Sequence, residues 1–270
     1  MTVSDAAKVL DFSAVDDLAF AAERGRLDLG HLPWSWRAHG LGPFLEALQL
    51  QRSGNLPDLE AANRLDPRPF RGLAAAVARN ENRWICPMSR MLGTLNATSS
   101  SLDWTSFAMD AQRAAISSGM TRDWAAQMVA AIGELRANID EHSAAAATGF
   151  VAFRAAQGIF EFVASDLGVG VLATLRMAPD YQSLSDHMEA LRLTLTEGAS
   201  RFGFQEGRGY GFRPLFTGLA NRNATLRFRS GNAMLRMDGT SPDLLHAQAA
   251  AKPPIRGFFV SVACSTGARI

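Results

Sequence analysis

The periodicity of the apolar residues changes from helical to alternating at about residue 145, and this change limits the folds open to the chain. We expect a helix N-cap at Thr121. Apolar residues then recur at the spacing of one helix face, at Trp124, Met128, Ala131, Ile132, Leu135 and Ile139. Further along, alternation predicts two strands, at about 149–155 and 158–165, joined by a turn near Gly158. A long amphipathic helix followed by such a pair predicts an α/β or α+β fold, with helices packed on a sheet.

The remainder of the second half alternates between helix, loop and strand patterns. We expect a helix at about 182–197, a glycine-rich irregular segment at 199–212, a short helix at 212–221, a hairpin turning at Gly231-Asn232, and a last buried strand at 257–263.

The first 85 residues predict a smaller α/β unit. Residues 26–34 are a candidate strand that ends in a turn, residues 40–55 an amphipathic helix closed by Ser-Gly-Asn, and residues 66–70 a turn. Residues 86–120 are polar around a serine run and are interpreted as a connector. We therefore divide the chain into residues 1–115, a small α/β N-terminal regulatory domain with its connector, and residues 116–270, a larger domain.

Composition excludes several classes of function. The net charge of +1 and 47% hydrophobic residues indicate a soluble globular protein. This balance demands neither a polyanion nor an anionic membrane as partner and argues against a general nucleic-acid binder. The start of the chain lacks a secretory signal, and no apolar run approaches the roughly 20 residues that span a bilayer. We expect a cytoplasmic protein in which Cys86 and Cys264 are free thiols.

Three polar residues share one stripe of the long predicted helix. Glu134, Asn138 and His142 lie four residues apart, so they project from one face. An amide oxygen can ligate Mg²⁺, and a carboxylate can orient or deprotonate a group that attacks a phosphate. An ordinary exposed helix face explains the same residues. His142 has two interpretations of its own, because a basic ring is also favoured at the end of a helix.

A second candidate element follows the second predicted strand directly. Asp166 at the strand end can accept a hydrogen bond from an exocyclic amine, and Gly168 and Gly170 would let the backbone approach a planar base. A simple turn explains the same residues.

The third element is the glycine-rich run Gly207, Gly209 and Gly211, which leads into the short helix expected at 212–221. Unpaired backbone donors at a helix start favour phosphate, although a flexible loop explains the run as well. Residues 201–270 carry ten Arg or Lys against three acids, which favours a negative partner. Arg201 and Arg208 could hold a γ-phosphate or remain in water.

In this order and spacing, ELRANIDEHS, SDLGVG and EGRGYGF resemble the asparagine box and the two glycine boxes of the GHKL ATPases, the superfamily of DNA gyrase, histidine kinases and MutL. The resemblance covers roughly residues 121–263. It implies a Bergerat-type two-layer sandwich, with helices on one face of a mixed β-sheet, that binds ATP and Mg²⁺ under a mobile lid at 198–210.

The resemblance also implies a role for each matching residue. Glu134 would be the general base, Asn138 the Mg²⁺ ligand and Asp166 the acid that reads adenine. Gly168 and Gly170 would lie beside the adenine, and Gly207, Gly209 and Gly211 beside the phosphates. Family members often have Gly-Thr near the last strand, whereas Phe258 follows Gly257 here, which affects the base pocket.

The pattern is closest to the compact branch of anti-sigma-factor serine kinases and stand-alone ATP-binding regulators. Lys252 is the one late lysine, and the chain has no room for a gyrase-type transducer domain. Residues 26–49 faintly resemble a STAS-like domain, which would add a regulatory module and a protein partner. Two functions stay open: an enzyme that hydrolyses ATP or phosphorylates a protein, and a nucleotide-gated interaction switch with negligible turnover.

Overall fold

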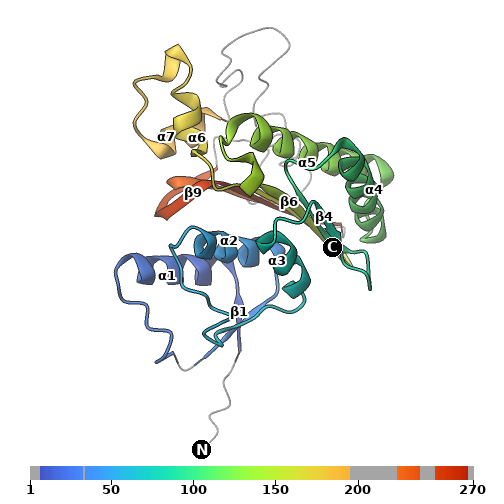
Figure 1. Cartoon of the computed structure of the whole chain (residues 1–270), viewed down its shortest axis with the longest axis horizontal. Coiled ribbons are helices and arrows are strands. Elements are labelled where there is room, and N and C mark those ends of the chain that lie inside the picture. The colour runs from blue at the N-terminus through green and yellow to red at the C-terminus, as the bar shows by residue number, and fades with distance from the viewer. Residues whose placement is uncertain (1–6, 33, 195–223, 238–246, 267–270) are drawn as a thin grey trace, which may run out of the picture.

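The computed structural model describes residues 7–32, 34–194, 224–237 and 247–266. The described elements stack in layers (Figure 1). Helices that lie between residues 101 and 193 cover one face of a six-stranded sheet. Three helices from the first 80 residues cover the other face, and a three-stranded sheet lies beyond them.

The N-terminal unit alternates strands with helices, as its sequence predicts. Its three short strands pair in parallel in the order β1-β2-β3. Asp11 caps the first helix by accepting a hydrogen bond from the Ala14 N–H at 2.8 Å. The candidate strand at 26–34 is wrong, because the strand begins only at Trp36. The elements are β1 (Lys8–Leu10), α1 (Phe12–Glu23), β2 (Trp36–Ala38), α2 (Leu41–Arg52), β3 (Leu65–Asp66) and α3 (Arg71–Ala78).

The large sheet has the strand order β4-β5-β6-β7-β9-β8, and every neighbouring pair in it is antiparallel. The expectation of a mixed sheet is therefore wrong for the large sheet. Parallel pairing occurs instead in the three-stranded sheet of the N-terminal unit. The hairpin predicted around Gly158 is confirmed, and Gly158 adopts the positive φ that its turn requires. The strands are β4 (Arg83–Ile85), β5 (Leu92–Asn96), β6 (Phe150–Ala156), β7 (Ile159–Ser165), β8 (Ala224–Met237) and β9 (Gln248–Ser265).

The hairpin expected at Gly231-Asn232 is wrong. Strand β8 continues through these residues and pairs with β9 on both sides of them, with register shifts at Ser230/Gly231 and Gly231/Ala233. Gly231 has a φ of +56°. A glycine with positive φ is compatible with a β-bulge as well as with a hairpin turn. The pairing of β8 with β9 on both sides of Gly231 shows that it lies in a bulge.

In the described part of the chain, the helical layer consists of α4 (Ser101–Ser117), α5 (Arg122–His142), α6 (Gly170–Leu175) and α7 (His187–Leu193). Thr121 caps α5, as predicted, by accepting from the Trp124 N–H. The predicted helix at 182–197 corresponds to the shorter α7, and α6 was not foreseen. Phe107 of α4 meets Phe153 of β6 edge to face at 5.3 Å, which fixes this layer on the sheet.

The side chains on the two faces of the large sheet pack into two different hydrophobic cores. Phe160, Phe162 and Ala164 of β7 pack toward α4 and α5, whereas Val163 packs toward the N-terminal helices. The strand is therefore buried almost continuously, because both of its faces are covered. The expectation that helices cover one face holds for α4 to α7, but α1, α2 and α3 cover the opposite face.

The segment expected as a connector, 86–120, is structured. It contributes β5 and α4 to the large sheet and its helical layer, and the sheet begins at Arg83, well before residue 116. Both cysteines are free, as predicted, and burial raises the pKa of Cys264 to about 12. Among the described helices, none combines the length and the apolar composition that a bilayer crossing requires.

Candidate functional site

The polar stripe of α5 has the geometry that the spacing predicts. Glu134, Asn138 and His142 all lie within this one helix, at intervals of four residues. Glu134 is exposed and Asn138 is half-buried, whereas Leu135 and Ile139 on the neighbouring face are fully buried in the core. Leu135 and Ile139 thus fix how the helix is rotated on the sheet, and that rotation sets the direction of the stripe.

His142 is the last residue of α5. Its backbone carbonyl accepts a hydrogen bond from the Thr174 hydroxyl of α6 at 3.2 Å, and its ring lies 4.0 Å from Glu141. Its place at the helix end favours the capping interpretation of this residue.

Asp166 comes immediately after β7 and is almost completely buried, with 1% of its surface exposed. Its Oδ1 accepts a hydrogen bond from the Gly168 N–H at 2.6 Å. Its Oδ2 is buried and has no hydrogen-bond partner among the described residues. Burial raises the pKa of this carboxyl to about 6, against the opposing effect of the Gly168 hydrogen bond. A buried acceptor without a partner needs a physical explanation, and a bound ligand that donates a hydrogen bond is one such explanation.

The loop that follows Asp166 packs against the end of α5. The Val169 N–H donates to the Ser143 carbonyl at 2.9 Å, and the Leu167 N–H donates to the Thr148 hydroxyl at 3.0 Å. The structure therefore brings the end of the first candidate motif, at Ser143, into contact with the second motif, although a hairpin separates them in the sequence. Asn138 precedes Ser143 by five residues, which is about 7–8 Å along a helix.

Two glycines permit this close packing. A Cβ on Gly168 would lie 1.9 Å from the Ser143 carbonyl oxygen, and a Cβ on Gly257 would lie 2.1 Å from the Asp166 carbonyl oxygen. Gly257 also has a φ of +71°. Gly168 and Gly257 thus allow two backbone segments of the protein to approach each other. This role agrees with the interpretation of Asp166, Gly168 and Gly170 as a simple turn. Gly170 opens α6 with a φ of +78°.

Phe258 contributes its backbone carbonyl to the contacts that hold Asp166. Its carbonyl accepts hydrogen bonds from the Asp166 N–H and the Ser165 hydroxyl, both at 3.2 Å. Its ring is buried and meets Phe228 edge to face at 6.3 Å. The side chain of Phe258 is therefore part of the core, and the threonine hydroxyl common in the GHKL family has no counterpart at this position.

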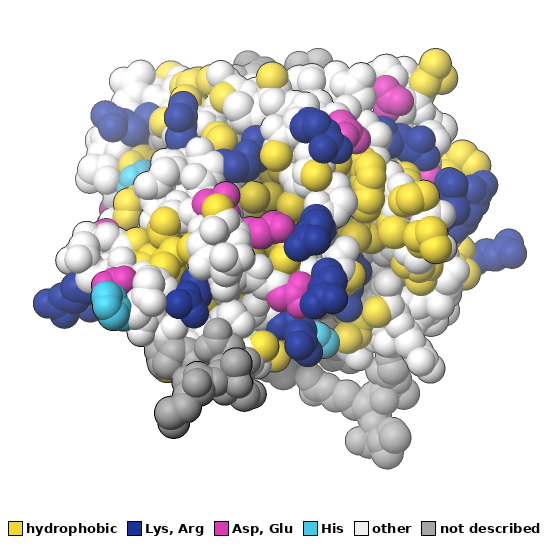
Figure 2. Space-filling model, turned by 60° about the horizontal axis from the view of Figure 1, so that its bottom comes forward, with side chains coloured by type: hydrophobic (Ala, Val, Ile, Leu, Met, Phe, Trp, Pro, Cys, Tyr) yellow, Lys and Arg dark blue, Asp and Glu magenta, His cyan; other side chains and the backbone are white. Residues whose placement is uncertain are grey.

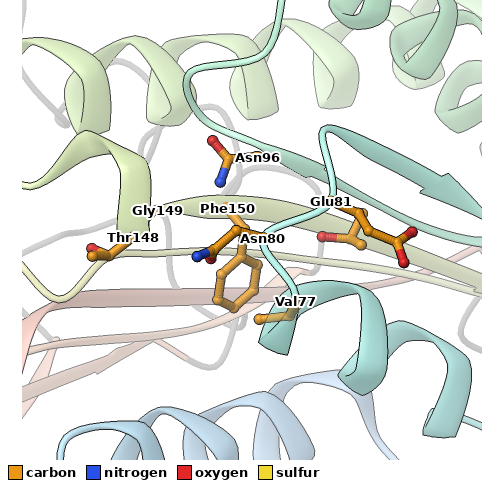
Figure 3. A pocket seen from close by; sticks show the side chains of 8 residues that line it. Val77, Asn80, Glu81, Asn96, Thr148, Gly149 and Phe150 are labelled. Carbon is orange, nitrogen blue, oxygen red and sulfur yellow. The ribbon is translucent and has the colours of Figure 1, made fainter.

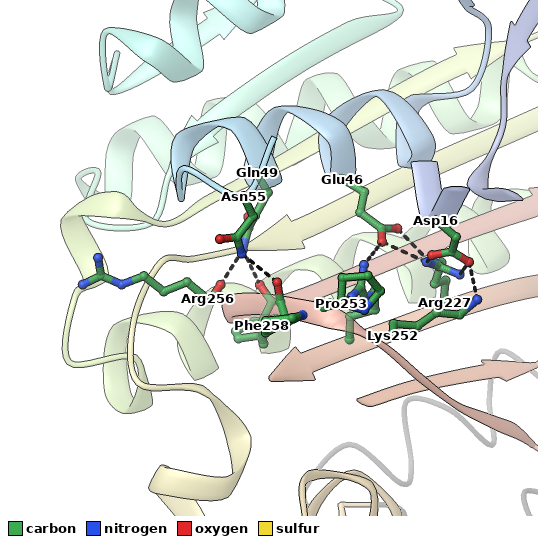
Figure 4. A network of polar contacts seen from close by, with 11 residues as sticks. Asp16, Glu46, Gln49, Asn55, Arg227, Lys252, Pro253, Arg256 and Phe258 are labelled. Atoms are coloured by element: carbon green, nitrogen blue, oxygen red, sulfur yellow. Dashed lines mark hydrogen bonds and ion pairs between the residues drawn. The ribbon is translucent and has the colours of Figure 1, made fainter. Parts of the chain in front are cut away.

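Sequence reasoning missed a residue that lies directly beneath the loop. Gln49 of α2 has no exposed surface, and its side-chain amide nitrogen lies 2.7 Å from the Asp166 carbonyl, 2.9 Å from that of Arg256 and 3.3 Å from that of Phe258. Figure 4 shows these contacts reaching from α2 to β9. The signal for Gln49 in the sequence was weak, because a glutamine three residues after Glu46 is ordinary in an amphipathic helix.

A buried ionic cluster lies one turn away from Gln49 (Figure 4). Glu46, with no exposed surface, pairs with Arg229 at 2.5 Å and with Arg227 at 2.7 Å. Asp16 pairs with Arg227 and with Lys252, both at 2.5 Å. Burial alone would lower the pKa of Arg227, but the charges and hydrogen bonds of Glu46 and Asp16 raise it.

This cluster revises the interpretation of the basic last third of the chain. Within the described part of this region, Arg227, Arg229 and Lys252 pair with acids of the N-terminal helices. They therefore do not favour an external anion. On the surface of the N-terminal unit, basic and acidic side chains are interspersed (Figure 2), and pairs such as Arg71–Glu60 lie in this unit.

A small hollow lies between the end of α3 and the large sheet (Figure 3). Its volume is about 180 Å³ including open solvent, and it is lined by Val77, Asn80, Glu81, Thr94, Asn96, Thr148, Gly149 and Phe150. Thr148 also accepts the hydrogen bond from Leu167, so one residue that lines the hollow contacts the Asp166 loop.

Arg201, Gly207, Arg208, Gly209 and Gly211, which form the third candidate motif, lie outside the described residues. Among the residues that the structure describes, no three His, Cys, Asp or Glu side chains are placed to hold a metal ion by themselves. In comparisons with known proteins, the chain matches no family model, no curated protein and no solved structure.

Proposed function

We propose that the chain is a GHKL-type regulatory protein that binds ATP with Mg²⁺, with the base at Asp166 and the phosphates along the polar stripe of α5. The buried, unpartnered Oδ2 of Asp166, on a loop held against the end of α5, is the observation that carries this proposal. The resemblance of three ordered motifs to the GHKL boxes supports the choice of nucleotide.

The base would be recognised by one hydrogen bond. With a pKa of about 6, the Asp166 carboxyl is mostly ionised at neutral pH, and Gly168 satisfies only its Oδ1. A buried carboxylate oxygen without a donor is costly, and an exocyclic amine would supply the missing N–H. Adenine carries such an amine and hypoxanthine does not, so the carboxylate would favour ATP over inosine triphosphate.

The phosphates would extend from the Asp166 loop toward the start of α5. Asn138 lies more than one turn before Ser143, and Glu134 lies one turn further. The Asn138 amide oxygen would hold Mg²⁺ together with phosphate oxygens, as this ion prefers. Mg²⁺ would neutralise charge that develops on the transferred phosphoryl group. Glu134, exposed to solvent in the described structure, would take a proton from water or from a partner's hydroxyl.

The architecture supports a Bergerat-type sandwich in part. The large sheet carries α4 and α5 on one face and places the strand end with Asp166 beside α5. The all-antiparallel pairing departs from the mixed sheet that the resemblance implies. The N-terminal unit would be the regulatory module that contacts a protein partner, and its STAS-like resemblance stays a prediction.

Turnover of γ-labelled ATP tests the enzymatic form of this proposal. Release of labelled phosphate, or its transfer to a protein, should fall at least 100-fold in Glu134→Ala, because the general base is lost. Asp140→Asn changes an exposed acid on the opposite side of α5 and should retain activity. ATP binding without turnover in the wild-type protein would favour the nucleotide-gated switch, and absence of binding would contradict both forms.

A further inference from the structure

Gln49 links the N-terminal unit to the backbone that carries Asp166. Its side chain donates to carbonyls at the end of β7 and in β9, segments separated from it by 117 to 209 residues in the chain. An amide nitrogen carries two hydrogens, so the two shortest contacts, to Asp166 and Arg256, receive them most directly. Gln49 thereby holds the end of β7 next to β9 from the face of the sheet that α2 covers.

The irregularity of β9 explains why a side chain is needed at this point. The pairing of β8 with β9 shifts between Phe258 and Ile255, and Gly257 between them has a positive φ. Such a bulge turns backbone carbonyls out of the ladder. A buried carbonyl without a donor is costly, and Gln49 supplies the donor for this stretch.

The position of Gln49 is itself fixed. One turn before it, Glu46 is bound to Arg227 and Arg229 of β8 in the buried cluster. Six residues after it, the Asn55 amide donates to the Pro254 carbonyl of β9 at 2.7 Å. Helix α2 and the turn that follows it are thus attached to the sheet on both sides of Gln49.

Asp166 is consequently held at three atoms. Its N–H donates to Phe258, its carbonyl accepts from Gln49, and its Oδ1 accepts from Gly168. Oδ2 is the remaining acceptor, and its direction depends on the other three contacts. We infer that Gln49 is a positioning residue for the base pocket. Through Gln49, the N-terminal unit fixes the orientation of the Asp166 carboxylate, and this orientation determines the preference for a 6-amino purine. This inference rests on the proposed function.

The test compares ATP with inosine triphosphate, which lacks the 6-amino group. In Gln49→Leu the affinity for ATP should fall about tenfold, the scale of one well-placed hydrogen bond, while the affinity for inosine triphosphate changes less than about threefold. Gln51→Leu makes the same chemical change two residues away, where the side chain donates to the Pro57 carbonyl at 3.1 Å, and should leave the ratio of the two affinities unchanged.

The outcomes separate this inference from the proposed function. A folded Gln49→Leu variant with a wild-type ratio of affinities would overturn the positioning role alone. If Gln49→Leu does not fold, Gln49→Asn keeps the amide but shortens its reach, so a lowered ratio supports the role and an unchanged ratio overturns it. A wild-type protein that binds neither nucleotide, or both equally, would overturn base recognition by Asp166 and this inference with it.

Discussion

Glu46 and Arg229 form an ion pair at 2.5 Å with neither residue exposed to solvent. The pair joins a helix of the first 80 residues to a strand of the last 50, across 183 positions of the chain. Because Arg227 shares the same carboxylate, the N-terminal unit and the large sheet form a single packed structure rather than two units joined by a linker.

Glu46→Gln should therefore destabilise the whole protein. The substitution removes the carboxylate that pairs with the buried Arg229 and leaves Arg227 paired with Asp16. Removing one partner of a buried ion pair typically costs about 3–5 kcal/mol in the free energy of unfolding. Glu60→Gln, which removes a surface partner of Arg71, should cost less than about 1 kcal/mol. Urea denaturation followed by circular dichroism measures both. A Glu46→Gln variant as stable as Glu60→Gln would show that the cluster does not hold the layers together.

Asp166 should make stability depend on pH. The pKa of Asp166 in the folded protein is about 6, above the ordinary value of 3.8. The contribution of this carboxyl to the free energy of unfolding is therefore fully present below pH 4 and is lost as the pH rises through 6. The shift corresponds to about 3 kcal/mol. The free energy of unfolding of wild type, relative to that of Asp166→Asn, should fall by roughly this amount between pH 4 and pH 7.5.

Denaturant titrations of both proteins at several pH values measure this difference, and groups other than Asp166 largely cancel in it. A difference that stays constant across the range would mean that the carboxyl titrates normally in the folded protein.

Gly168→Ala should be far more disruptive than Gly158→Ala. The new methyl group at Gly168 would overlap the Ser143 backbone, whereas a methyl group at Gly158 meets no atom within 4 Å and suffers only from the positive φ. We expect a cost of about 1 kcal/mol at Gly158 and more than about 2 kcal/mol at Gly168. Thermal unfolding compares the two, and equal costs would argue against the close contact between the Asp166 loop and α5.

The sequence predicted the features that depend on local periodicity. Helix α5 with its cap at Thr121, and the hairpin of β6 and β7, were identified because each pattern is contained within a few neighbouring residues. The continuity of β8 was missed, because the same glycine serves a bulge or a turn and only the distant partner β9 distinguishes them.

The support of the candidate site was missed for a related reason. Gln49 and Glu46 are ordinary polar residues of an amphipathic helix until the large sheet is placed against them. Arg227 and Arg229 alternate with the core residues Leu226 and Phe228, which in retrospect indicates that this face of β8 meets acids. Charge counted along the chain could not separate internal ion pairs from a binding surface.

The affinity for ATP should rise with pH through the titration of Asp166. A hydrogen bond from the base favours the ionised carboxylate, so binding becomes about tenfold tighter between pH 5 and pH 7 when the free carboxyl has a pKa of about 6. Asp166→Asn should lack this component, whereas the titration of the phosphates is common to both proteins. Calorimetric titrations at pH 5, 6 and 7 measure the two profiles, and parallel profiles would separate Asp166 from the base.

Calorimetry at pH 7.5 with ATP and with a non-hydrolysable analogue, each with and without Mg²⁺, tests the central proposal most directly. We predict saturable binding of both nucleotides at one site, weakened at least tenfold by removal of Mg²⁺ and by Asp166→Asn, with Asp140→Asn equal to wild type. Binding that is absent, or that is indifferent both to Mg²⁺ and to Asp166, would contradict a nucleotide site between α5 and the Asp166 loop.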